Sequence, residues 1–268
     1  MLFGALGDIH GAFEAARGIM ERHREVPFWL CVGDVADPDG RYETFPAPLY
    51  WIKGNNENFD LIEQWMAGGK PPPHTVGSEP NTAGGKPYTA GGPGVYPPPS
   101  ALDDQDGTAG AKPAPHSGQP IPNGTLQTID GLRVAGLGGT FAPTMYELPA
   151  SELPHPKKSS AKATELADRR RHFVREEVDR CKAMSNVDIF LSHEAPRPFR
   201  VDRGIDAGKT PINEVLAAMK PRLHLFGHHH RFVEAEVAGV RSVCLDLVSK
   251  SYLLIDRHTL EYQHLAVK

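Results

Sequence analysis

The apolar positions along the chain predict two regions in which strands and helices alternate. In the first region, up to residue 67, three short apolar runs lack the polar alternation of a half-exposed strand; they read LFGALGD, FWLCVGD and PLYWIKGN. Residues 11–25 lie between the first two runs, and their apolar side chains recur at the spacing of one helical face. A second, shorter helical pattern, NFDLIEQWM, follows the third run. Such strands, buried on both faces, are typical of a mostly parallel sheet covered on both sides.

The second region begins at residue 125 and predicts further strands and two helices. Two alternating runs flank Asp130-Gly131, a pair that favours a tight hairpin turn. The segment 159–184 predicts a long charged helix, and 210–220 a helix with proline in its first turn. Buried strands are expected in VDIFLSHEAP and RLHLFGHHH, and antiparallel strands in the last 37 residues. Together the two regions predict one α/β (α+β) domain over 1–268, with two sheets and helices outside them.

Residues 68–124 differ from the rest of the chain in composition. They contain 12 of its 27 glycines and 13 of its 25 prolines, with little apolar content. Such a segment cannot bury enough apolar surface to offset the entropy lost on ordering, so we predict a mobile Pro/Gly-rich insertion within the domain. We expect deletion of about 70–120 to leave the core folded. Its proline runs also offer a ligand for a protein partner.

Composition limits the compartment and the partners. The net charge is −4, so the whole chain does not attract nucleic acid or an acidic membrane. Cys31, Cys181 and Cys244 are far apart and lie mostly in apolar runs, as expected for buried thiols in a reducing compartment. No apolar run approaches the roughly 20 residues of a membrane span. We therefore expect a cytoplasmic protein that does not bind membranes.

Polar residues follow the predicted buried strands in a recurring way. Ligands of open α/β sheets gather beyond the carboxyl ends of the strands, so we expect these residues to meet at one edge. Glycine precedes the polar residue in four of the five turns, which allows a sharp bend or a close ligand. The residues are Asp8, His10, Asp34, Asn55, His193, His228 and His230.

The chemistry of these side chains indicates a metal site. Carboxylate and amide oxygens with imidazole nitrogens, and without a thiolate, suit manganese, iron, zinc or nickel. There are too many ligands for one ion, and a carboxylate such as Asp34 can bridge two. Two ions about 3.5–4 Å apart can hold a phosphoryl group and generate hydroxide at neutral pH. The set D-x-H, GD, GN, H, GH-x-H therefore predicts two divalent metal ions and phosphoester chemistry.

This ordered set resembles that of the calcineurin-like metallophosphoesterases over 1–67 and about 125–268. The resemblance implies a four-layer αββα sandwich. It also implies that Asp8, His10, Asp34 and His230 bind the first metal ion. Asp34, Asn55, His193 and His228 would bind the second, with Asp34 as the bridge. His229 is expected to point away from both ions.

The local resemblance is strongest to lariat RNA debranching enzymes. VDIFLSHEAPR is similar to that family's DIFLSHDWPR, and a charged helix is expected in the same place. This chain departs from that family in having Asp8 where the family has cysteine, and Asn56 where it has histidine. The resemblance implies a phosphodiesterase, with a nucleotide or RNA as substrate.

Asn56 leaves the proton donor unidentified. In the family a histidine at this position contacts the phosphate and helps the leaving oxygen depart. Asparagine can donate a hydrogen bond to a phosphate oxygen but cannot transfer a proton. Glu57, Glu194 and His10 are possible donors in its place, and the sequence does not select one. We expect Asn56 to bind the substrate phosphate.

Two arginine positions offer further phosphate contacts. Arg197 lies four residues after His193 and could bind a phosphodiester oxygen with its guanidinium; a solvated loop arginine is the alternative. For Arg169, Arg170 and Arg171 we expect a solvated helix face, with contact to a nucleic-acid backbone as the alternative.

Two other functions stay open on the sequence. The fold also serves a catalytically weak scaffold that binds proteins, and the insertion would then face the partner. A protein or phosphomonoester phosphatase is the other alternative, although hydrolysis of monoesters relies more on the missing histidine. All the predicted metal ligands are present, which favours a metal-dependent phosphodiesterase over a scaffold.

Overall fold

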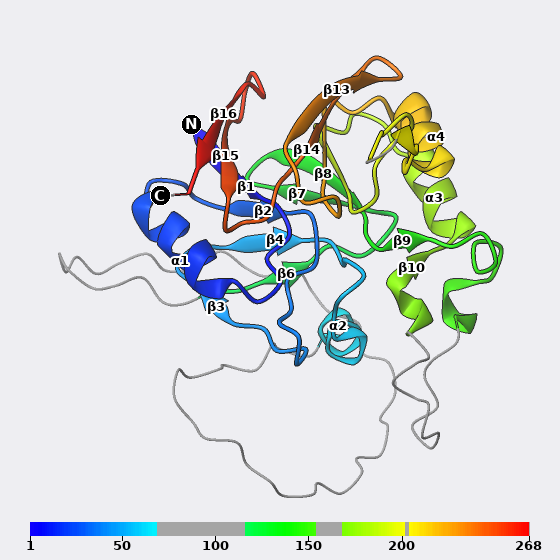
Figure 1. Cartoon of the computed structure of the whole chain (residues 1–268), viewed down its shortest axis with the longest axis horizontal. Helices are drawn as coiled ribbons and strands as arrows, with labels where there is room; N and C mark the ends of the chain where they lie inside the picture. The colour runs from blue at the N-terminus through cyan, green and yellow to red at the C-terminus, as the bar shows by residue number, and fades with distance from the viewer. Residues whose placement is uncertain (69–115, 154–167, 202–203, 268) are drawn as a thin grey trace, which may run out of the picture.

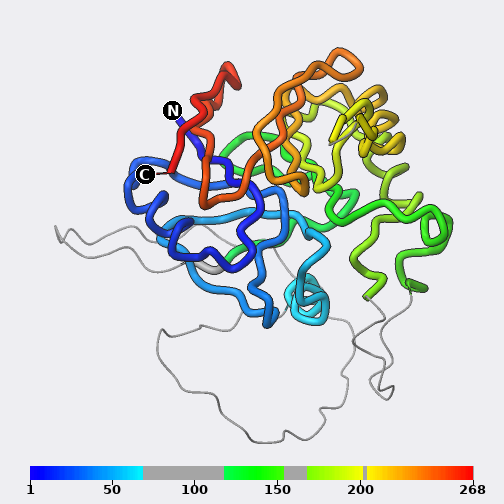
Figure 2. Tube along the Cα trace, viewed as in Figure 1, coloured from blue at the N-terminus to red at the C-terminus, as the bar shows by residue number. Residues whose placement is uncertain are grey.

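A computed structural model of the chain contains two six-stranded sheets packed face to face (Figure 1). It describes residues 1–68, 116–153, 168–201 and 204–267. Figure 2 shows that the N-terminal and C-terminal segments lie together in one sheet, while the middle of the chain forms the other. Among the described residues, no helix is long and apolar enough to cross a membrane.

The first sheet combines the start and the end of the chain. Its order is β16-β15-β1-β2-β4-β6, and β1, β2, β4 and β6 run parallel. β15 pairs antiparallel with β1, and β16 pairs antiparallel with β15. The strands are β1 (Leu2–Leu6), β2 (Trp29–Cys31), β4 (Leu49–Trp51), β6 (Gln119–Pro120), β15 (Ser251–Asp256) and β16 (Tyr262–Ala266).

The second sheet has the order β13-β14-β12-β11-β8-β7 and a parallel centre. Its strands are β7 (Thr125–Ile129), β8 (Leu132–Leu137), β11 (Ile189–Ser192), β12 (Leu223–Phe226), β13 (Val233–Val237) and β14 (Val240–Cys244). The predicted hairpin joins β7 to β8: Asp130 and Gly131 both have positive φ, 45° and 80°, as a tight two-residue turn requires.

Alternation along the central strands builds a four-layer core. In β2, Trp29 and Cys31 contact the apolar cluster under the helices α1 (Phe13–Arg22) and α2 (Phe59–Met66), while Leu30 lies in the cluster between the sheets. The same holds in β11, where Ile189 and Leu191 face the other sheet. Phe190 of β11 packs in the cluster with α3 (Arg175–Lys182) and α4 (Thr210–Met219). The predicted αββα sandwich is confirmed.

The predicted helix over 159–184 is wrong in part. Residues 154–167 lie outside the described residues, and of the rest only Arg175–Lys182 is α-helical. A short 3-10 turn at Arg169–Arg171 leads into β10 (His172–Phe173), which pairs with β9 (Thr140–Phe141). Pairing with β9 therefore overrides the helical pattern of charges. A further 3-10 turn spans Ala150–Glu152.

The predicted insertion ends earlier than position 124. Residues 69–115 lie outside the described residues, but β5 (His116–Ser117) pairs with β3 (Thr44–Phe45), and β6 pairs with β4. Ile121 is buried between the sheets. A deletion of 70–120 would therefore remove a strand of the first sheet, and the sequence boundary needs this correction. The error arose because the pairing uses backbone groups, which the composition of the segment does not reveal.

Replacing Ile121 with alanine tests this correction. The side chain is 2% exposed and packs against Gly136, so its loss leaves a cavity between the sheets. We expect the free energy of unfolding to fall by roughly 2–5 kcal/mol, measured by denaturant titration. Ile205→Ala is the matched control, because Ile205 is 61% exposed; an equal effect of the two substitutions would contradict the assignment.

Candidate metal centre

The seven predicted ligands meet where five strands end. Asp8 follows β1, Asp34 follows β2, and Asn55 follows β4, all in the first sheet. His193 follows β11, while His228 and His230 follow β12, in the second sheet. The site thus lies where the edges of the two sheets meet.

Two imidazoles and one carboxylate form the first group of ligand atoms. The Nε2 atoms of His10 and His230 lie 3.1 Å apart, and Nε2 of His230 is 3.2 Å from Oδ2 of Asp8. The other oxygen of Asp8, Oδ1, is buried and has no hydrogen-bond partner among the described residues. A buried carboxylate oxygen without a donor is costly unless a cation lies beside it. This group can therefore hold a metal ion.

The second group is built around His193. Its Nδ1 lies 2.8 Å from the carbonyl oxygen of Val32, to which it donates, so Nε2 is the ring atom that faces the site. Nε2 is 3.0 Å from Oδ1 of Asn55 and 3.5 Å from Oδ2 of Asp34. The ring of His228 lies 5.0 Å from the His193 ring, between centroids. Several acceptors thus surround a space that suits a cation.

Asp34 belongs to both groups. Its Oδ2 is 3.4 Å from Nε2 of His10 and 3.5 Å from Nε2 of His193. One carboxylate oxygen between two imidazoles of different groups is the geometry that a bridging ligand needs. The donor set of oxygens and nitrogens fits two divalent ions and does not select one metal.

Charge interactions within the site are strong. Burial disfavours the charged form of Asp34, but hydrogen bonds from His193 and Asn56 hold its pKa well below the usual range. Burial likewise opposes protonation of His193, but the bond to Asp34 and the charges of Asp8 and Asp34 raise its pKa to about 10. His228 shows the opposite shift: burial and the nearby His193 lower its pKa to about 3, leaving a neutral ring with a free lone pair.

Backbone conformation at the site is constrained. Four of the predicted ligands have left-handed φ values, 45° for His10, 47° for Asp34, 70° for His228 and 49° for His230. Such conformations are disfavoured for these residues and concentrate at functional sites. Glycines allow the loops to approach: a Cβ on Gly54 would lie 2.0 Å from Oδ1 of Asp34, and one on Gly227 would lie 2.2 Å from Oδ1 of Asp8.

His229, predicted to point away, stacks on Phe199 with ring centroids 4.4 Å apart. The ring of Phe199 also lies under the guanidinium of Arg231, at 4.5 Å. His229 therefore packs into a cluster of its own beside the predicted ligands.

Asn56 contacts the carboxylate of Asp34. Its backbone N–H donates to Oδ1 of Asp34 at 2.7 Å, and its side-chain amide donates to Oδ2 at 3.0 Å. The predicted contact with a substrate phosphate is not tested by this arrangement. The structure adds a role that the sequence did not suggest, which is to fix the orientation of Asp34.

Arg197 forms an ion pair with Asp206. Its Nε donates to Oδ2 of Asp206 at 2.9 Å, and its backbone N–H donates to Asn213. To bind a substrate phosphate, as predicted, it would have to leave Asp206.

Two of the proposed proton donors are held in hydrogen bonds. Glu57 accepts from the backbone N–H groups of Val35, Ala36 and Gly54 and from the hydroxyl of Tyr42. Burial and the charge of Asp34 nevertheless raise the pKa of Glu57 to about 7.

Glu194 is also buried. It accepts from the N–H of Phe141, while its Oε2 lies 3.8 Å from Nζ of Lys209. Burial raises its pKa. Through these contacts both glutamates hold backbone N–H groups of the loops in place. The contacts do not identify either glutamate as the proton donor.

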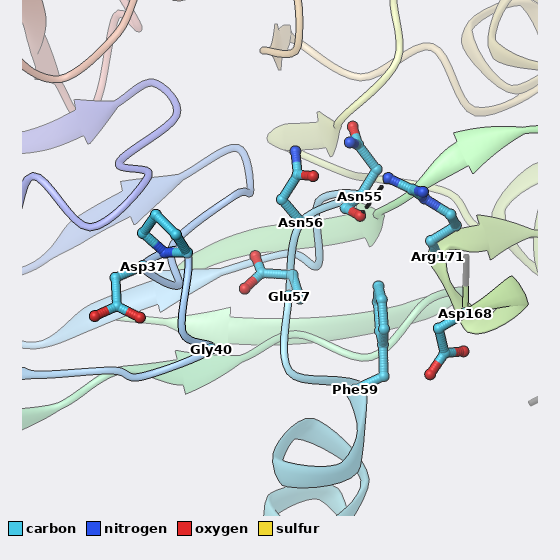
Figure 3. Close-up of a pocket in the computed structure, with 9 residues that line it drawn as sticks. Asp37, Gly40, Asn55, Asn56, Glu57, Phe59, Asp168 and Arg171 are labelled. Carbon is cyan, nitrogen blue, oxygen red and sulfur yellow. Dashed lines mark hydrogen bonds between the residues drawn. The ribbon is translucent and has the colours of Figure 1, made fainter. Parts of the chain in front are cut away.

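A pocket of about 300 Å³ lies beside the ligand loops (Figure 3). Arg171 points into it toward Asn55, and its Nη2 donates to the Asn55 carbonyl oxygen at 2.7 Å. The predicted solvated helix face at Arg171 is wrong, because the residue lies in a 3-10 turn that directs it to the site. The aromatic and β-branched residues of HFV, just after the arginines, were the available signal for a strand there. The lining residues are Asp37, Pro38, Gly40, Asn55, Asn56, Glu57, Phe59, Asp168 and Arg171.

Comparison with known proteins agrees with this geometry. The family model described as calcineurin-like phosphoesterase matches residues 1–232. The chain is similar to the crystal structure of TT1561 from Thermus thermophilus, with a TM-score of 0.55 and 12% identity over 100% of this chain and 99% of that one. At this identity the likeness shows the fold alone.

Some other solved structures are less similar to the chain. A solved structure described as a novel archaeal phosphodiesterase has a TM-score of 0.39 and 11% identity over 99% of both chains. No curated protein matches the chain.

Asp34→Asn tests whether this carboxylate bridges two ions. Because Oδ2 is shared between the two groups, we expect wild type to bind two divalent ions per chain and the variant to bind both at least about 10-fold more weakly. Elemental analysis after equilibration with metal and desalting measures this. Asp39→Asn, whose side chain is 74% exposed, is the control. Loss of a single ion, with full occupancy of the other, would show that Asp34 serves one site alone.

Proposed function

Because the chain belongs to the calcineurin-like phosphoesterase family, we propose that it is a metal-dependent phosphodiesterase acting on a nucleotide or nucleic-acid diester. The members of this family are hydrolases that act on phosphoesters and typically depend on two metal ions. The observation that carries the proposal is the position of Asp34, shared by two groups of ligand atoms. The adjacent pocket offers space for the group esterified to the phosphate.

The chemistry divides between the ions and the chain. Two divalent ions held by these residues would stabilise negative charge on the phosphoryl group and lower the pKa of a water molecule. The chain fixes the ligands: Val32 sets the tautomer of His193, and Asn56 orients Asp34. Among the metals that suit this donor set we propose manganese.

Asn56 supports a diester over a monoester as substrate. Its amide can hydrogen-bond a phosphate oxygen but supplies no proton to the leaving group. A general acid contributes roughly 10²–10⁴-fold, so the reaction must rely more on the ions and on positioning. The similarity of VDIFLSHEAPR to the debranching enzymes supports a nucleic-acid diester, and a branched RNA remains a prediction.

The cysteines support a cytoplasmic location. All three are buried and form no disulfide. Free thiols of this kind are typical of proteins in a reducing compartment. Cys31, for example, donates from Sγ to the carbonyl oxygen of Gly7 and so packs within the first sheet.

The direct test is a panel of substrates with protein loaded with Mn²⁺, Zn²⁺ or Ni²⁺. We expect kcat/KM for bis(p-nitrophenyl) phosphate to exceed that for p-nitrophenyl phosphate, and chelation to abolish both activities. Hydrolysis of the monoester alone would favour a phosphatase. Full metal occupancy without hydrolysis of any ester would favour the scaffold alternative.

Asn56→His tests whether the missing acid limits the reaction. A p-nitrophenolate leaving group needs little protonation, whereas a ribose alkoxide needs much. We therefore expect the variant to raise kcat/KM on a dinucleotide by some part of the roughly 10²–10⁴-fold that a positioned acid supplies. Activity on the aryl diester should change less.

Asn56→Ala is the control for this variant, since it removes the amide without adding a proton donor. The ratio of kcat/KM values for the two substrates should not rise in the control. An unaltered ratio in Asn56→His, with metal content unchanged, would mean that another group already supplies the proton.

A further inference from the structure

Arg171 is held beside the predicted metal ligands by its neighbours in the chain. Nζ of Lys53 donates to the carbonyl oxygens of Arg170 and His172, at 2.8 and 3.1 Å, so it fixes the backbone on both sides of Arg171. The guanidinium of Arg170 is mostly buried and pairs with Asp168, Asp60 and Glu63. Arg170 therefore anchors the turn, and Arg171 is left to project over Asn55.

The guanidinium of Arg171 makes one hydrogen bond to a protein oxygen in the described part of the chain, to the carbonyl oxygen of Asn55. None of the carboxylates that the structure describes forms an ion pair with it. Its side chain has five N–H donors in a planar fork, so several remain for a ligand. Arg170 provides the contrast within one turn, because its charge is balanced by three carboxylates.

The carboxylates of the same pocket already have partners. Asp37 accepts from Nε of Arg41 at 2.7 Å, Glu57 accepts from Tyr42 and three backbone N–H groups, and Asp168 pairs with Arg170. Arg171 is thus the charge in this pocket without a counter-charge among the described residues (Figure 3). Next to a centre that binds divalent cations, such a charge is unfavourable unless an anion lies between them.

We propose that Arg171 binds the phosphate of the substrate, with its guanidinium donating to non-bridging oxygens of an ester held at the adjacent metal centre. This assignment rests on the proposed function for the identity of the anion. Arginine suits the role because its planar fork bonds two phosphate oxygens at once, which an ammonium group cannot do. Because Asn55 is both a predicted ligand and the partner of Arg171, one residue connects the anion site to the metal site.

The test compares Arg171→Ala and Arg171→Lys with wild type, using metal-loaded protein and inorganic phosphate as the probe. Arg171→Ala removes charge-assisted hydrogen bonds and should therefore weaken phosphate binding by about 10- to 100-fold, as measured by calorimetry. The loss in kcat/KM for bis(p-nitrophenyl) phosphate should be similar. Arg171→Lys should recover a minor part of each loss, since the charge returns without the fork. Arg169→Ala, in the same turn, is the matched control and should behave as wild type.

Metal content and melting temperature show whether Arg171 binds the phosphate or only supports the structure of the metal centre. We expect both to stay at wild-type values in Arg171→Ala. Unchanged phosphate affinity and unchanged kcat/KM would overturn the proposal, and so would a loss of metal ions, because Arg171 would then serve to position Asn55. Weakened phosphate binding in a protein that hydrolyses no ester would support the anion site and refute the proposed function.

Discussion

The site depends on the contacts that the carboxylate of Asp34 makes with His10 and His193. This carboxylate lies at the end of β2 in the first sheet, within 3.5 Å of His193 at the end of β11 in the second. It is also 3.4 Å from His10, so one side chain joins both groups of ligand atoms. Without metal, His193 donates a hydrogen bond to this carboxylate, and a divalent ion bound there would take the place of that proton. The fold therefore brings the ends of the two sheets together at one carboxylate, which the predicted metal ions would share.

A second layer of hydrogen bonds keeps these loops in place. Glu57 accepts hydrogen bonds from the N–H groups of Val35, Ala36 and Gly54, so it connects the loop after β2 to the loop after β4. Tyr42 donates to the same carboxylate and accepts from the N–H of Asn58, which caps the N-terminus of α2. Removing one such partner would leave buried polar groups without bonds, which costs more than a surface contact is worth. The rigidity of the centre is thus shared among residues that do not bind metal.

The turn at Arg169–Arg171 shows how one segment can divide its roles. Three successive arginines have the same chemistry in the sequence, but Arg170 is buried in a set of ion pairs while Arg171 faces the pocket. The difference follows from the 3-10 turn, in which successive side chains point about 120° apart. Lys53 fixes the turn by donating to two carbonyl oxygens of this segment, and it comes directly before the Gly54-Asn55 pair of the ligand loop.

While the four-layer sandwich followed from the family resemblance, local sequence patterns were enough to predict two sheets with helices outside them, the hairpin at Asp130-Gly131 and the set of seven polar residues. Those features depend on runs of apolar residues, a turn pair that tolerates positive φ, and polar residues placed just after strands. The remaining features depend on contacts between distant segments, which the folded chain alone establishes. Such contacts placed β6 beside β4, placed the strand β10 within the predicted charged helix, turned Asn56 onto Asp34, paired Arg197 with Asp206 and brought Arg171 over Asn55. In each case the partner lies elsewhere in the chain or beyond a bend, so no local pattern of charge or hydrophobicity specifies it.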